Sequence, residues 1–106
     1  MLVSTKEMLR DAQARHYAVG AFNVENLEFV MAVIRAAEAK KSPVIMQTTP
    51  GTLKYAGLEY FVSMVRTAAQ KASVPVALHL DHGDSFDRCM QAMRAGYTSV
   101  MIDGSH

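Results

Sequence analysis

Histidines and carboxylates gather in one short stretch of the chain, at His79, Asp81, His82 and Asp84. Neutral imidazole is a good ligand for zinc and related metals, and a carboxylate can bind a metal or move a proton. An Asp directly beside a His at a strand end allows one residue to hold a metal while the other faces a substrate proton. His79 also has a plainer interpretation as a hydrogen-bonded core residue, because two leucines flank it.

Polar residues also follow the other apolar runs of the chain. Asn23 follows one run, Gln47 to Thr49 end a second, and Asp103 to His106 follow a third. Ligands of parallel α/β proteins bind at the carboxyl ends of the strands, so this pattern favours an active-site rim. Local interpretations remain open, because Asn23 can cap a helix and the two threonines can shape a turn.

Four apolar runs are predicted to be the strands that position these residues, near residues 17–22, 43–48, 74–80 and 98–102. The segments between them have helical periodicity, and another helix is predicted before the first strand. Strands that alternate with helices of about ten or more residues indicate parallel βαβ units. Because the strands are almost continuously apolar, both faces of the sheet are expected to be covered. The sequence therefore predicts an α/β fold.

Short motifs predict where the helices begin and end. Ser4 to Glu7 fits a capping box, Asn23 is a suitable N-cap for the next helix, and Asp84 to Asp87 resembles a second capping box. Thr49 to Thr52 is interpreted as a turn, and Gly96 is placed like a glycine that ends a helix.

Composition excludes several classes of function. The chain has 106 residues, 11 Lys and Arg against 10 Asp and Glu, and a formal net charge of +1. This balance argues against nucleic acid as a partner. No apolar run approaches the roughly 18 residues that span a membrane. The single cysteine, Cys89, excludes an intramolecular disulfide framework and predicts a reduced, cytoplasmic protein.

Five segments, taken in order, resemble the class II, zinc-dependent ketose-bisphosphate aldolases, which include fructose-1,6- and tagatose-1,6-bisphosphate aldolases. The Leu-His-Leu-Asp-His-Gly motif, followed about twenty residues later by Met-Ile-Asp-Gly-Ser-His, is the most specific part of the resemblance. The segments are Ala21–Asn23, Ser42–Ile45, Gln47–Gly51, Ala77–Gly83 and Ser99–His106. Members of this family are (β/α)8 barrels, so the resemblance implies that residues 1–106 form the first half of a TIM barrel, with parallel strands 1–4 after an N-terminal helix.

The resemblance also implies roles for individual residues. Asp81 matches the catalytic acid/base, and His82 matches the first of three zinc-ligating histidines. Asn23 and Thr49 match positions that contact the dihydroxyacetone-phosphate part of the substrate, where Thr49 keeps the hydroxyl of the usual serine. Asp103 matches an acid near the metal, as an alternative or second-site ligand. His106 is not assumed to replace a missing zinc ligand.

The implied reaction is the cleavage of a ketose 1,6-bisphosphate to dihydroxyacetone phosphate and glyceraldehyde 3-phosphate. Zn²⁺, the implied cofactor, acts as a Lewis acid that stabilises the enediolate left by cleavage. Asp81 takes the proton of the C4 hydroxyl in cleavage and returns it in condensation. The resemblance further implies a place in glycolysis and carbohydrate metabolism, and a homo-oligomer, either a dimer or a tetramer.

Four βα units are half of the eight that a TIM barrel needs, so we expect the chain to be the N-terminal part of a longer aldolase. On this hypothesis the 106-residue chain alone binds zinc weakly, does not catalyse cleavage and exposes two sheet edges. Two alternatives are kept open. One is a half-barrel that assembles with a copy of itself without catalysis. The other is a different metal-dependent TIM-barrel enzyme.

Overall fold

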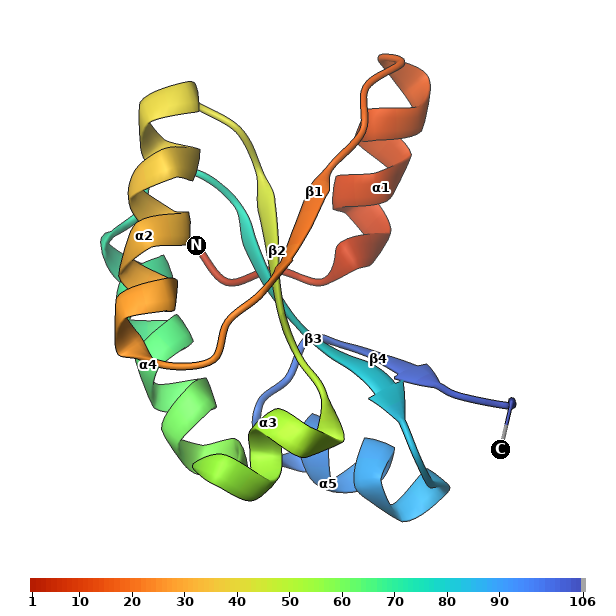
Figure 1. Ribbon diagram of the computed structural model, residues 1–106. Coiled ribbons are helices and arrows are strands. Elements are labelled where there is room, and N and C mark those ends of the chain that lie inside the picture. The colour runs from red at the N-terminus through yellow and green to blue at the C-terminus, as the bar shows by residue number, and fades with distance from the viewer. Residues whose placement is uncertain (106) are drawn as a thin grey trace.

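The computed structural model describes residues 1–105, and four parallel strands alternate in it with helices (Figure 1). His106, which the resemblance placed in the last motif, lies outside the described residues. The elements in chain order are α1 (Thr5–Ala14), β1 (Gly20–Asn23), α2 (Leu27–Lys40), β2 (Val44–Thr48), α3 (Pro50–Tyr55), α4 (Leu58–Lys71), β3 (Val76–Gly83), α5 (Phe86–Ala95) and β4 (Ser99–Ile102). The predicted α/β class with a helix before the first strand is confirmed.

The strands form one sheet in the order β1-β2-β3-β4, and every neighbouring pair is parallel. Asn23 pairs with Gln47, and Gln47 pairs in turn with His79. The first strand begins three residues later than predicted, at Gly20, and it includes Asn23. The third continues beyond its predicted end at Leu80, as far as Gly83. The residues expected just after these two strands therefore belong to them and are held by the sheet.

Helix ends follow some of the predicted caps and depart from others. Ser85 caps α5, because its Oγ accepts a hydrogen bond from the backbone N–H of Arg88 at 3.0 Å. Gly96 ends that helix with a φ of 121°, a backbone conformation that favours glycine. The predicted cap at Asn23 is wrong: Asn26 caps α2 by accepting from the backbone N–H of Phe29 at 2.9 Å.

Two further local predictions are wrong. Ser4 precedes α1 but makes no side-chain capping bond, so Ser4 to Glu7 is not a working capping box. Thr49 to Thr52 is not a simple turn, since Thr49 is the N-cap of the short helix α3 and Pro50 occupies its first turn. Proline suits that position because the amide it lacks would have no partner inside the helix.

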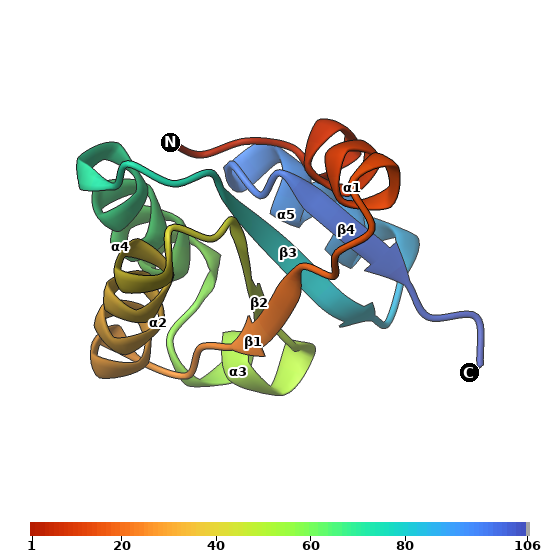
Figure 2. The ribbon, with the colours of Figure 1, turned by 90° about the horizontal axis from the view of Figure 1, so that it is seen from above.

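The two faces of the sheet are covered differently. On one face, α2, α4 and α5 pack on alternate residues of the central strands, including the fully buried Met46, Leu78 and Leu80. On the other face, Met8 of α1 packs against Ile45 and Ala77 in a much smaller cluster. Figures 1 and 2 show α1 apart from the α2–α4 pair, near the amino-terminal halves of the strands. The carboxyl-terminal half of this second face is thereby left to polar side chains.

None of the helices within residues 1–105 is both long enough and apolar enough to cross a membrane.

Candidate active site

An irregularity at the end of β3 brings Asp81 and His82 to the same side of the sheet. Leu80 pairs with Val100 and Gly83 pairs with Ile102, so β3 carries one residue more than β4 across this interval. His82 has a φ of 54°, in the left-handed region that non-glycine residues seldom adopt. Consecutive residues of a regular strand point to opposite faces, but such a bulge redirects a side chain. The Nε2 of His82 consequently lies 3.7 Å from Oδ2 of Asp81.

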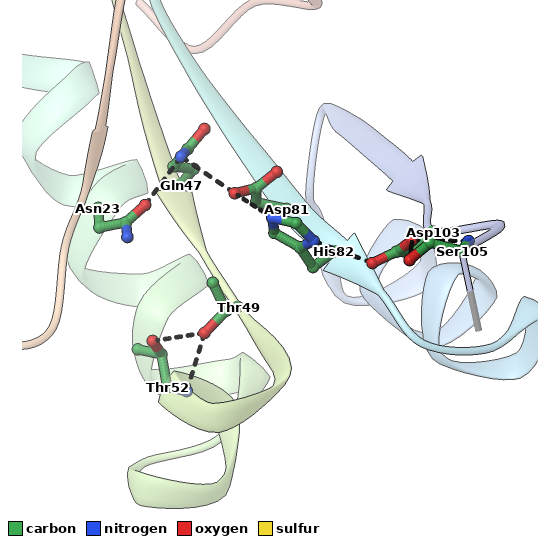
Figure 3. Close-up of polar contacts among 8 residues, drawn as sticks. All are labelled: Asn23, Gln47, Thr49, Thr52, Asp81, His82, Asp103 and Ser105. Atoms are coloured by element: carbon green, nitrogen blue, oxygen red, sulfur yellow. Dashed lines mark hydrogen bonds and ion pairs between the residues drawn. The ribbon is translucent and has the colours of Figure 1, made fainter.

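The imidazole of His82 lies between two carboxylates (Figure 3). Its Nδ1 is 2.9 Å from Oδ2 of Asp103, in the segment that follows β4. Because a carboxylate only accepts, Nδ1 carries the hydrogen and Nε2 points toward Asp81. The hydrogen bond with Asp103 and, second, the charge of Asp81 raise the pKa of His82 above its ordinary value. The side chain of His82 is 59% exposed.

Asp103 is held more firmly than the histidine that it contacts. Its side chain is only 8% exposed. Its Oδ1 accepts from the backbone N–H of Ser105 at 2.9 Å and from the hydroxyl of the same residue at 2.6 Å. Its backbone N–H donates to the carbonyl oxygen of Gly83 at 2.9 Å, extending the pairing of β3 with the chain after β4. The carboxylate is therefore a fixed acceptor that orients the imidazole of His82.

A second set of polar contacts crosses three strands (Figure 3). The Nε2 of Gln47 donates to Oδ1 of Asn23 at 2.8 Å and to Oδ2 of Asp81 at 3.3 Å. The Asp81 side chain is 21% exposed and Gln47 is half-buried, whereas Asn23 is exposed. Asn23, Asp81, His82 and Asp103, four of the five residues assigned from the sequence, thus belong to one connected group.

Thr49, the fifth residue, lies apart from this group in Figure 3. Its Oγ1 accepts from the backbone N–H of Thr52 at 3.4 Å and lies 3.2 Å from the hydroxyl of that residue. The hydroxyl of Thr52 in turn donates to Glu25 at 2.9 Å, which links the start of α3 to the loop after β1. Thr49 is therefore a helix cap at the carboxyl edge of the sheet.

His79 points to the same face as Asp81 but takes no part in the rim. Its Nδ1 lies 2.7 Å from Oγ of Ser99, which also accepts from the hydroxyl of Thr5 in α1 at 3.3 Å. Burial lowers the pKa of His79, although the charge of Asp81 acts in the opposite direction. The interpretation of His79 as a hydrogen-bonded interior residue agrees with this geometry.

Gly83 allows β3 and β4 to approach closely beneath the histidine. A Cβ atom added at this position would lie 2.5 Å from Sγ of Cys89 and 2.6 Å from the carbonyl oxygen of Met101. Real Cβ atoms do not approach other atoms so closely, so a side chain here would push the strands apart. The position is glycine for lack of space, and the contact between His82 and Asp103 depends on it.

Two features of the site were not assigned from the sequence. Gln47 was placed at a strand end without a role, because a glutamine in an apolar run carries no signal of its partners. The bulge was also missed, although a polar residue directly before a glycine at a strand end is a weak sign of one. Among residues 1–105, no group of three or more His, Cys, Asp or Glu side chains is placed to hold a metal ion.

Comparison with known proteins places the chain in a family. The family model described as fructose-bisphosphate aldolase class-II matches residues 3–106. A fructose-bisphosphate aldolase of Thermus caldophilus is 53% identical over the whole chain, which covers 34% of that relative. A 6-phospho-5-dehydro-2-deoxy-D-gluconate aldolase of Halalkalibacterium halodurans is 52% identical over 99% of the chain, and 38% of that protein is covered. The chain therefore spans little more than a third of these relatives.

Solved structures give the same result for the fold. The crystal structure of the YdjI aldolase from Escherichia coli K12 superposes on 99% of the chain with a TM-score of 0.93 and 43% sequence identity, and 41% of that structure is covered. The four parallel strands and the helix before them therefore match part of a class II aldolase barrel. The chain belongs to the class II fructose-bisphosphate aldolase family.

Proposed function

We propose that this chain supplies part of the active site of a zinc-dependent aldolase that cleaves a ketose 1,6-bisphosphate to dihydroxyacetone phosphate and glyceraldehyde 3-phosphate. One observation carries the proposal. The bulge of β3 places the Asp81 carboxylate and Nε2 of the exposed His82 side chain 3.7 Å apart, and Asp103 holds the other ring nitrogen of His82. A possible metal ligand and a possible proton carrier are thus fixed side by side.

The geometry of His82 fits a zinc ligand. Histidines that bind metals usually donate their second ring N–H to a carboxylate, which fixes the tautomer and the direction of the ring. His82 is arranged in this way, because its Nδ1 donates to Asp103 and its Nε2 is directed toward Asp81. Zinc held there supplies Lewis-acid stabilisation of the negative charge that develops on the substrate oxygen.

Asp103 was expected as a metal ligand from the family resemblance. Its Oδ2 accepts a hydrogen bond from the His82 ring and its Oδ1 accepts one from Ser105. We therefore assign Asp103 the role of orienting the His82 ring. A catalytic zinc site usually has three protein ligands, so the other ligands come from residues outside 1–105.

Asp81 is assigned the proton transfer. Within residues 1–105, both polar neighbours of its carboxylate, Gln47 and His82, lie at Oδ2. This arrangement leaves Oδ1 to take the proton of the C4 hydroxyl in cleavage and to return it in condensation. The carboxylate is partly buried, and its backbone belongs to β3.

Asn23 and Thr49 are proposed to bind the dihydroxyacetone-phosphate part of the substrate. The amide of Asn23 is exposed beside Asp81 and Gln47, where its NH2 group can donate to a substrate oxygen. Thr49 lies further along the carboxyl edge and caps α3. Because the hydroxyl of Thr52 donates to Glu25, the Thr49 hydroxyl donates to Thr52 and must turn from it to donate a hydrogen bond to the substrate.

The test is a cleavage assay on the protein as its gene encodes it. Fructose 1,6-bisphosphate, tagatose 1,6-bisphosphate and 6-phospho-5-dehydro-2-deoxy-D-gluconate are each supplied, because the similar proteins carry names for different substrates. We expect cleavage of a ketose bisphosphate that is lost with a chelator and restored by zinc. Cleavage that survives complete removal of metal, or cleavage of the gluconate derivative alone, contradicts the proposal.

We further propose that the 106-residue chain alone is inactive. Residues 1–105 hold one exposed imidazole at the rim, and within them strands β1 and β4 are both at edges of the sheet. Unpaired edges favour association, so the isolated chain is expected to aggregate. Zinc-dependent cleavage above background by this polypeptide, with nothing added, contradicts the proposal.

The remaining proposals concern the whole protein in the cell. We infer a homo-oligomer, either a dimer or a tetramer, from the family resemblance. We infer a reducing, cytoplasmic environment from the single cysteine, Cys89, which is a buried free thiol. Sedimentation of the protein encoded by the gene tests the first inference, and a monomer contradicts it.

A further inference from the structure

Gln47 joins Asn23 and Asp81, two residues of the proposed site, through hydrogen bonds of its side chain. It stands on β2 between Asn23 on β1 and Asp81 on β3, and its single amide nitrogen donates to both (Figure 3). The backbone fixes the position of Gln47, because Gln47 pairs with Asn23 in the sheet and its backbone carbonyl oxygen accepts from the backbone N–H of Val24 at 3.0 Å.

The direction of these hydrogen bonds follows from the charge of Asp81. An ionised carboxylate only accepts, so Gln47 must present its NH2 group to Oδ2 of Asp81 rather than its carbonyl oxygen. The same NH2 group then has a second hydrogen to donate, and Asn23 must meet it with Oδ1. The Nδ2 of Asn23 is consequently turned away from Gln47 and available as a donor.

We infer that Gln47 is a positioning residue through which the negative charge of Asp81 determines the hydrogen-bonding group that Asn23 presents to the substrate. The inference rests on the proposed function for the roles of Asp81 and Asn23. It adds that the two roles are coupled. Asn23 is a donor because Asp81 is a carboxylate, and removal of Gln47 leaves both residues in place but independent.

The physical coupling is tested without any reaction. In the protein encoded by the gene, asparagine is labelled with nitrogen-15, and the side-chain amide signal of Asn23 is identified by its loss in Asn23→Ala. Asp81→Asn introduces an amide that can accept as well as donate, so it should shift the Asn23 signal. In the Gln47→Met background, which has similar length but no amide, Asp81→Asn should leave the Asn23 signal unchanged.

The contribution to catalysis is tested with kinetics of ketose-bisphosphate cleavage. Gln47→Met should lower kcat/KM roughly tenfold, the effect of one lost hydrogen bond to a charged group. Because Asn23 then has no fixed orientation, Asn23→Ala should cost clearly less in the Gln47→Met background than in the original protein. Thr48→Val is the matched control. It removes the bond to Tyr97 from the opposite face of the same strand and should leave the cost of Asn23→Ala unchanged.

Each outcome decides one of the two claims. The inference is overturned if Asp81→Asn leaves the Asn23 signal unchanged, or if Asp81→Asn still shifts that signal in the Gln47→Met background. This holds whether or not the protein is an aldolase. The same conclusion follows if Asn23→Ala costs the same factor with and without Gln47. A protein that shows the expected spectral coupling but cleaves no ketose bisphosphate contradicts the proposed function and leaves the coupling through Gln47 supported.

Discussion

The ring of His82 and the carboxylate of Asp103 meet across 2.9 Å, although 21 residues separate them in the chain. The histidine extends from a bulge at the end of β3, and the aspartate follows β4, where its own oxygens are fixed by Ser105. The contact leaves Nε2 of His82 as the ring atom directed toward Asp81. The proposed zinc ligand is therefore oriented before any metal binds.

Shortening or neutralising Asp103 should weaken zinc binding in steps. Asp103→Asn keeps an oxygen for Nδ1 of His82 but loses the charge, so we expect about tenfold weaker binding; Asp103→Ala removes the acceptor, and the loss should approach about a hundredfold. Competition with a coloured zinc chelator measures both affinities in the protein encoded by the gene.

His82→Asn provides the reference for that series. Asparagine tolerates the left-handed backbone that His82 adopts, so this variant should fold normally while it loses the ligand. An oriented-ligand role for Asp103 predicts that Asp103→Asn retains more zinc affinity than His82→Asn. Equal losses in the two variants indicate that Asp103 is itself a zinc ligand, and no loss in Asp103→Ala contradicts both roles.

Two histidines on β3 should have pKa values that are shifted in opposite directions in the metal-free protein. The bond with Asp103 raises the pKa of His82, and burial lowers the pKa of His79. The His82 pair thus stabilises the fold fully below the unfolded pKa of about 6.5, and its contribution disappears as pH rises through the folded pKa. His79 has the opposite effect, since its contribution is present above about 6.5 and disappears as pH falls through its lowered pKa.

Proton NMR titration of the imidazole signals measures both pKa values. Asp103→Asn should bring the pKa of His82 down toward 6.5 and leave that of His79 unchanged. Zinc binding should weaken below the raised pKa of His82, because the proton and the metal compete for Nε2. A His82 pKa below that of His79 would mean that the contact with Asp103 does not form in solution.

Gly83→Ala should disturb the site through the backbone. The added methyl group would meet the carbonyl oxygen of Met101 at 2.6 Å and Sγ of Cys89 at 2.5 Å, so β3 and β4 must separate. Overpacking of this kind costs about 1–3 kcal/mol of unfolding free energy. We also expect loss of the His82–Asp103 bond, visible as a lowered His82 pKa in the folded variant. Unchanged stability together with an unchanged pKa contradicts the account of this glycine.

A buried pair of hydroxyl groups, on the face of β2 opposite Gln47, should contribute to the stability of the fold and not to activity. Thr48 is fully buried, and its Oγ1 lies 2.7 Å from the hydroxyl of Tyr97. Burial raises the pKa of Tyr97 to about 12. Tyr97→Phe leaves the Thr48 hydroxyl without its partner and should cost about 1–3 kcal/mol.

The double variant is the control for this pair. Thr48→Val added to Tyr97→Phe removes the second hydroxyl and should cost less than the sum of the two single changes. Urea denaturation measures the unfolding free energies of the original protein, the two single variants and the double variant, which form a double-mutant cycle. Strict additivity contradicts a hydrogen bond between the two residues.

The sequence was sufficient for the parts of the fold that periodicity controls. The alternation of apolar runs and helical stripes predicted four parallel strands and the helix before them, and the structure has that order. The predicted helix caps were less exact, because residues close together in the sequence can suit the same N-cap position. The cap of α5 was expected within Asp84 to Asp87, and the structure has it at Ser85. Asn23 was expected to cap α2 in place of Asn26, because both are asparagines and sequence alone does not place the end of β1.

The site was predictable as a set of residues but not as an arrangement. Asn23, Asp81 and His82 were found because their types stand out at strand ends. The bulge was missed, since the residue types of β3 give only the weak sign of a polar residue before Gly83, and the close approach of Gly83 to Met101 is a contact with another strand. Gln47 was given no role from the sequence, because its two hydrogen-bond partners lie on neighbouring strands.

The most direct test of the account is Asp81→Asn, studied for zinc content and for ketose-bisphosphate cleavage in the same preparations of the protein encoded by the gene. Because Asp81 is assigned the proton and His82 the metal, the variant should bind zinc as the original protein does. Its kcat should fall by about a hundredfold or more, the usual contribution of a general acid–base group. A variant with full zinc occupancy and an unchanged kcat would contradict the central claim.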